Sequence, residues 1–97
     1  MSGKIGITPE LMEQRAGDYR RESDEIKGVI GRMDTLLLNL QSEWEGKASQ
    51  SYAQRYQELR KNFENAAELA EEISITLNKV ANQYRDVDNA IANGLMG

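Results

Sequence analysis

The stretch Trp44-Glu45-Gly46 lies near the middle of the 97-residue chain and decides how the chain folds. It is the only helix break between two long amphipathic patterns, and it contains the sole Trp. Glycine suits a chain reversal because it tolerates positive φ and lets backbones approach closely. The stretch therefore predicts a tight turn between two antiparallel helices. We expect Trp44 and Gly46 to form the turn motif, with the Trp44 ring closing the end of the hairpin.

The first helix is expected over about residues 8–43. Thr8 can cap it with the side-chain hydroxyl, Pro9 suits the first helical position, and Glu10 lies at the positive end of the helix dipole. Apolar residues then recur at alternating steps of four and three, the spacing of helices that pack against one another, and only Ser23 interrupts them. This first stripe consists of Met12, Ala16, Tyr19, Ser23, Ile26, Ile30, Met33, Leu37, Leu40 and Trp44.

The second helix is expected over about residues 47–92, with the same steps of three and four. Its stripe consists of Tyr52, Tyr56, Leu59, Phe63, Ala66, Ala70, Ile73, Leu77, Val80, Tyr84, Val87 and Ile91. Residues 1–7 are expected to form a short leader and residues 93–97 a flexible tail. The predicted fold is thus all-α: one domain over residues 1–97, built as an antiparallel helix-turn-helix hairpin.

The composition excludes several classes of function. With 12 basic and 16 acidic residues the net charge is -4, and no basic stripe for nucleic acid occurs. The longest apolar run, residues 36–38, is too short for stable membrane insertion, and the first residues lack the apolar core of a signal peptide. His and Cys are absent, so most metal sites and nucleophile–base pairs are excluded. We expect no cofactor and no enzymatic activity.

A wider apolar face indicates that two helices are not the whole assembly. Val29 and Leu36 lie beside the first stripe and Leu69 beside the second, and a bundle needs such a wider face whereas a two-stranded contact does not. The alternative is that these three side chains are partly exposed. We expect a dimer of hairpins, and so a four-helix bundle. Its core is expected to contain Ile26, Val29, Ile30, Met33, Leu36, Leu37, Leu40, Leu59, Phe63, Leu69, Ile73 and Leu77.

A chain of about a hundred residues with two amphipathic helices and a central Trp-x-Gly resembles the WXG-100 family of ESAT-like small secreted proteins. The resemblance covers roughly residues 5–92 and rests on Trp44, Gly46, Ala48 and Tyr52, together with the opening over residues 8–10. It implies export by a type VII (ESX-type) secretion system without a cleaved signal peptide. It also implies four-helix bundles, formed as homodimers or as heterodimers with a related small helical protein.

The resemblance further implies an export signal of the form Tyr-x-x-x-Asp/Glu near the end of the second helix. Tyr84 and Asp88 match it, and on a helix their side chains lie one turn apart on one face. The secretion ATPase of the type VII system is the implied reader of this signal. The structural alternative for Tyr84 is packing in the core, because it belongs to the second stripe.

Taken together, these features predict a secreted, non-enzymatic interaction protein that resides in the cytoplasm before export. The alternative is a cytosolic adaptor or chaperone that pairs with the helical leader of a larger secreted toxin. The acidic charge and the mean hydropathy of -0.67 disfavour a third possibility, membrane disruption. In each case we expect a hairpin that offers a surface for docking rather than a pocket.

Overall fold

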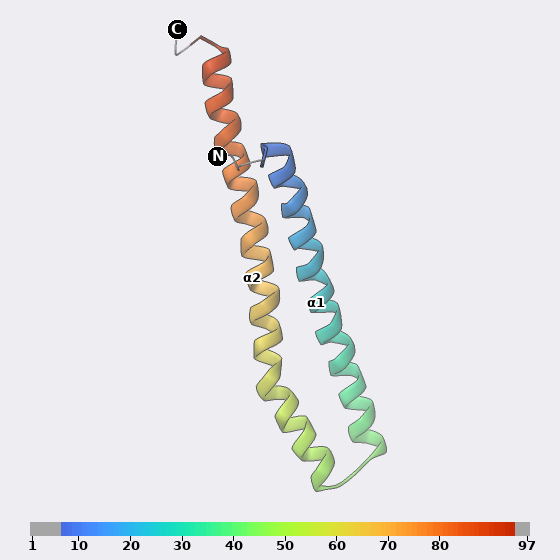
Figure 1. The fold of residues 1–97 in the computed structure, drawn as a ribbon. Helices are drawn as coiled ribbons and strands as arrows, with labels where there is room; N and C mark the ends of the chain where they lie inside the picture. The colour runs from blue at the N-terminus through green and yellow to red at the C-terminus, as the bar shows by residue number, and fades with distance from the viewer. Residues whose placement is uncertain (1–6, 95–97) are drawn as a thin grey trace.

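The computed structural model describes residues 7–94, which form two long antiparallel helices lying side by side (Figure 1). Helix α1 spans Pro9–Glu43 and helix α2 spans Lys47–Ala92, with no strand in the described part. The hairpin predicted from the sequence is confirmed. It is slender, measuring 75 × 24 × 15 Å along its principal axes. Most of the expected leader and tail lies outside the described residues.

The start of α1 follows from three adjacent residues. The Thr8 side chain, in extended backbone conformation, accepts a hydrogen bond of 3.1 Å from the Leu11 N–H. Pro9 has no N–H to leave unpaired, and Glu10 places a negative charge at the positive end of the dipole. Neither α1 nor α2, over the residues described, has a stretch long and apolar enough to cross a bilayer.

The turn between the helices spans residues 44–46. The Trp44 N–H donates a hydrogen bond of 2.8 Å to the Leu40 carbonyl oxygen, which ends α1. Gly46 is the N-cap residue of α2, with φ of 131° and ψ of -179°, and its carbonyl oxygen accepts a hydrogen bond of 3.2 Å from the Gln50 N–H. Only glycine adopts this backbone conformation at little cost, so the tight reversal depends on Gly46.

Small residues line the seam where the two helices meet. The residues with the lowest exposure include Ala16 and Ser23 on α1, and Ala67, Ser74 and Ala81 on α2, each 2% exposed or less. Small side chains let two backbones approach closely but bury little apolar area. The helices of one chain are therefore close together while most of their large apolar side chains lie elsewhere.

This seam differs from the one that the second stripe indicated. The sequence suggested close approach at Ala66 and Ala70; Ala70 is buried, but Ala66 is exposed and its neighbour Ala67 is buried instead. The seam of α2 follows a series of mostly small residues seven apart. That series comprises Ala53, Arg60, Ala67, Ser74 and Ala81. The larger apolar residues of the stripe flank the seam rather than fill it.

Helix α2 is longer than α1, with 46 residues against 35, and its C-terminal part extends past the start of α1 (Figure 1). Ala81 is the last buried residue of α2 in the described chain. The final turns of α2 are thus free of the seam.

Candidate functional site

One flank of the seam carries ion pairs between the helices. They join Lys27 to Glu71 at 3.0 Å, Arg60 to Asp34 at 2.8 Å, and Arg85 to Glu13. The side chains in these pairs are 30–54% exposed. Ion pairs with this exposure add little stability, but they favour one register of the helices over others.

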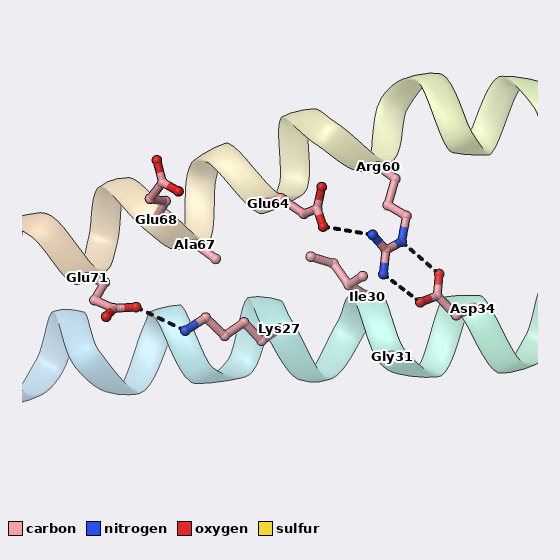
Figure 2. A pocket seen from close by; sticks show the side chains of 9 residues that line it. All are labelled: Lys27, Ile30, Gly31, Asp34, Arg60, Glu64, Ala67, Glu68 and Glu71. Atoms are coloured by element: carbon pink, nitrogen blue, oxygen red, sulfur yellow. Dashed lines mark hydrogen bonds and ion pairs between the residues drawn. The ribbon is translucent and has the colours of Figure 1, made fainter.

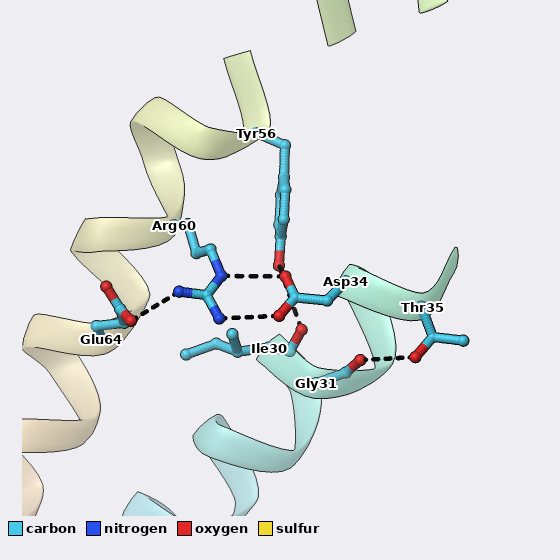
Figure 3. Close-up of polar contacts among 7 residues, drawn as sticks. All are labelled: Ile30, Gly31, Asp34, Thr35, Tyr56, Arg60 and Glu64. Carbon is cyan, nitrogen blue, oxygen red and sulfur yellow. Dashed lines mark hydrogen bonds and ion pairs between the residues drawn. The ribbon is translucent and has the colours of Figure 1, made fainter. Parts of the chain in front are cut away.

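The most connected polar cluster surrounds Asp34 (Figure 3). Arg60 donates two hydrogen bonds to its carboxylate, from Nε at 3.0 Å and from Nη2 at 2.8 Å, and the Tyr56 hydroxyl donates a third at 2.7 Å. Arg60 also donates to Glu64 at 2.7 Å. Hydrogen bonds from Arg60 and then from Tyr56 lower the pKa of Asp34 to about 2. The cluster joins the helices in the half of the hairpin nearer the turn.

A hollow of about 420 Å³ lies beside this cluster, between the helices (Figure 2). It is lined by Lys27, Ile30, Gly31, Asp34, Arg60, Glu64, Ala67, Glu68 and Glu71. The expectation of a surface without any pocket is therefore wrong. Both basic side chains of the hollow are already paired with carboxylates, and residues 7–94 contain no cluster of three or more potential metal ligands.

The other flank of the seam is apolar and spans both helices. We define the apolar face as Tyr19, Val29, Met33, Leu36, Leu40, Leu59, Phe63, Leu69, Tyr84, Val87 and Ile91, each 37–64% exposed. Most neighbouring residues of this set are three or four positions apart, so they lie along one side of each helix. Near the turn the two helices contribute to one groove of about 220 Å³, lined by Met33, Leu36, Leu37, Leu40, Tyr52 and Tyr56.

The twelve residues expected in the core of the assembly divide into three groups. Ile30 alone is buried within one chain, at 6% exposure. Half-buried are Ile26, Leu37, Ile73 and Leu77. The other seven are exposed, namely Val29, Met33, Leu36, Leu40, Leu59, Phe63 and Leu69. The hairpin by itself therefore leaves most of this set in contact with water.

Trp44 lies at the turn and is 41% exposed. The ring centroid is 6.2 Å from that of Tyr52, and the two planes are tilted by 41°. Ser49, one turn into α2, is buried at the same end of the molecule. Trp44 therefore covers the start of α2 only in part, and its exposed part is available to another molecule.

Tyr84 and Asp88 lie in the C-terminal part of α2, which ends at Ala92. Tyr84 is 48% exposed and continues the apolar face, and Asp88 is exposed. Between them in sequence, Arg85 contacts Glu13 and Glu10 of α1. The sequence analysis did not identify Arg85, because its partners are 72 and 75 positions away along the chain.

A family model described as "WXG100: Proteins of 100 residues with WXG" matches residues 4–89, which include Trp44, Gly46, Tyr84 and Asp88. The chain belongs to the WXG100 family. Among WXG100 relatives, Protein YukE of Bacillus subtilis is 32% identical over the full length of both chains. Type VII secretion system extracellular protein A of Staphylococcus aureus is 27% identical over 92% of each.

Solved structures of similar proteins have the same hairpin. EsxA of Geobacillus thermodenitrificans is 39% identical, with a TM-score of 0.86 over 95% of this chain and 99% of that one. A mutant of the secreted protein EsxB from Bacillus anthracis is 26% identical, with a TM-score of 0.80 over 93% and 99%. The hairpin of this chain is therefore similar over nearly its whole length to those of proteins from two other bacteria.

Proposed function

We propose that this chain is a non-enzymatic substrate of a type VII secretion system, exported as a dimer of hairpins without removal of a signal peptide. Membership of the WXG100 family supports the secretion route, as does the similarity to a type VII extracellular protein. The exposed apolar face is the observation that supports the proposed dimer. Before export the chain is cytoplasmic, and after export it acts through its surface.

The apolar face is larger than a single folded chain can shield. Leu36 is 64% exposed, Leu69 57% and Val87 58%, all on the same side of the hairpin. A continuous exposed apolar surface of this kind is typical of a protein–protein interface rather than of a stable monomer. Packing two such faces together yields a four-helix bundle, in which the ion-paired flanks remain in water.

A homodimer is the simplest partner choice, because the face can pair with its own copy about a two-fold axis. Sedimentation of the purified chain should give about twice the 11.0 kDa of one chain. A well-folded species of 11.0 kDa at high concentration would contradict the dimer. A monomer that becomes fully helical only with a related small helical protein would instead indicate a heterodimer.

For recognition, we propose that Tyr84 and Asp88 form the signal read by the secretion ATPase. Both are exposed in the single hairpin, in the C-terminal part of α2, and their spacing of four residues presents a ring and a carboxylate together. Tyr84→Ala and Asp88→Asn should each stop secretion while circular dichroism stays unchanged. The native host with and without its secretion ATPase provides the baseline. Normal secretion of both variants would refute this signal.

The same apolar face supports one other candidate, an adaptor that binds the helical leader of a larger secreted protein. An amphipathic leader helix could cover the face in place of a second copy. Affinity purification from the host would separate the two ideas. Stoichiometric recovery of a large partner favours the adaptor, whereas recovery of the chain with itself favours the secreted dimer.

A further inference from the structure

Arg85 lies inside the segment Tyr84–Asp88, yet its side chain reaches across to α1 and does not belong to the apolar face. Its Nη2 donates a hydrogen bond of 2.9 Å to Glu13 Oε1, its Nη1 bonds the second oxygen of the same carboxylate, and Nη2 also reaches Glu10 at 3.5 Å. A guanidinium that bonds both oxygens of one carboxylate is held in direction as well as in distance. Arg85 is therefore a fixed link between α2 and the first turns of α1.

This link stands at the boundary between the packed and free parts of α2. Ala81, fully buried, is one helical turn before Arg85 on the same side of the helix. After Ala81 no residue of the described chain is buried, and the contacts of Arg85 are the only polar contacts found there between α2 and α1. Arg85 thus extends the attachment of α2 by one turn beyond the seam.

Without the link, that turn would belong to the end of a helix with few contacts, and such ends open readily. Tyr84 and Asp88 flank Arg85 by one and three positions, so opening there would separate the ring from the carboxylate. A receptor that reads both groups on one face needs this turn to stay helical. The link lowers the conformational entropy that recognition would otherwise have to remove.

We propose that Arg85 is a positioning residue, which holds Glu13 and Glu10 and so fixes the turn of α2 that carries Tyr84 and Asp88. The proposal rests on the function proposed above, since it assumes that these two side chains form the export signal. It assigns to Arg85 a role through α1, not a contact with the receptor. It also makes Glu10 and Glu13, more than 70 residues from the signal, part of the device that presents it.

The test is a double-mutant cycle on secretion, measured as the secreted fraction well below the melting temperature. Arg85→Gln removes one side of the link, Glu10→Gln with Glu13→Gln removes the other, and the triple variant removes both. Removing either side of the link alone should lower the secreted fraction by about twofold to fivefold, the size of effect that corresponds to one exposed Arg–carboxylate pair. The triple variant should lose no more than the worse of the two, because a link can be broken only once.

Asp34→Asn is the matched control, since it breaks another Arg–carboxylate pair between the helices, in the half of the hairpin nearer the turn. It should be secreted normally although it lowers stability. Equal loss from Asp34→Asn would show that secretion follows general stability, which overturns the positioning role.

Three further outcomes separate this inference from the proposed function. A loss from Arg85→Gln but not from the glutamate variant means that the receptor contacts Arg85 itself, and the inference fails. The inference also fails, and the function stands, when none of these variants changes secretion but Tyr84→Ala stops it. Normal secretion of Tyr84→Ala and Asp88→Asn removes the proposed signal and the inference with it.

Discussion

The hydroxyl of Ser23 on α1 donates a hydrogen bond of 2.8 Å to the carbonyl oxygen of Ala67 on α2. Both residues are buried, Ser23 completely. Ser23 is the one polar residue in the apolar stripe of α1. At this position the two helix backbones are close enough for a side chain of α1 to donate a hydrogen bond to the main chain of α2. A larger side chain at position 23 would push the helices apart.

Replacing Ser23 tests this contact. Ser23→Ala should lower the free energy of unfolding by about 1 kcal/mol, because one buried hydrogen bond is lost without a change in backbone spacing. Ser51→Ala, at an exposed position of α2, is the control for the helix propensity that alanine adds. Urea unfolding of the two variants measures the difference. Equal stability of both would mean that the bond contributes nothing.

Gly46→Ala should destabilise the hairpin by about 1–3 kcal/mol, because φ of 131° is strained for any residue with a Cβ. Gly17→Ala is the opposite case. Nothing lies within 4 Å of a Cβ added at Gly17, so alanine should stabilise α1 by about 1 kcal/mol. The melting temperature should therefore fall for Gly46→Ala and rise for Gly17→Ala, relative to the wild type. A rise in melting temperature for Gly46→Ala would contradict the role of this turn.

The Asp34 cluster predicts a specific loss of stability in acid. The folded pKa of Asp34 is about 2, below its ordinary value of 3.8, so the unfolded chain takes up this proton first as the pH falls. Stability from the bonds with Arg60 and Tyr56 is thus nearly complete above about pH 5 and is lost progressively as the pH falls through the folded pKa of about 2. In Asp34→Asn this group no longer titrates. The difference in melting temperature between wild type and Asp34→Asn should narrow from pH 5 to pH 2, and a constant difference would contradict the assignment.

Leu36 and Leu38 offer a matched pair for the proposed dimer. They are 64% and 67% exposed, but Leu36 lies on the apolar face beside Met33, whereas Leu38 shares a hollow with Asp34 on the ion-paired flank. Leu36→Glu should weaken self-association by at least tenfold, because a charge would be buried in the interface. Leu38→Glu should leave it unchanged. Sedimentation over a concentration series measures the self-association of both variants. Dissociation caused by Leu38→Glu but not by Leu36→Glu would place the interface on the ion-paired flank and contradict the proposed dimer.

The hairpin could be predicted from the sequence because its signals are local. Thr8 and Pro9 start α1, Gly46 permits the reversal, and the steps of three and four identify two helices. Each signal depends on residues within one or two turns of the chain. Leu38 and Ile75 fitted neither stripe, and both are more than half exposed; nothing in the structure explains Ile75.

The seam and the ion pairs could not be predicted in the same way. A stripe of apolar residues shows which side of a helix avoids water, but not whether its partner is the helix of the same chain or of another. Here the large residues lie on the apolar face, and the closest contact uses Ala67 and Ser74. The repeat of small residues at intervals of seven was the available signal. The bond between Asp34 and Arg60 depends on how the helices are aligned, which three-dimensional packing sets.

The seam of the hairpin consists mainly of alanine and serine, so a single chain buries little apolar area. The stability of the hairpin would therefore depend on its association with a second chain. If the proposed dimer forms, dilution should destabilise the fold, and the melting temperature should fall with each tenfold dilution of the protein. Folding and dimerisation of this chain would then be coupled in a single transition.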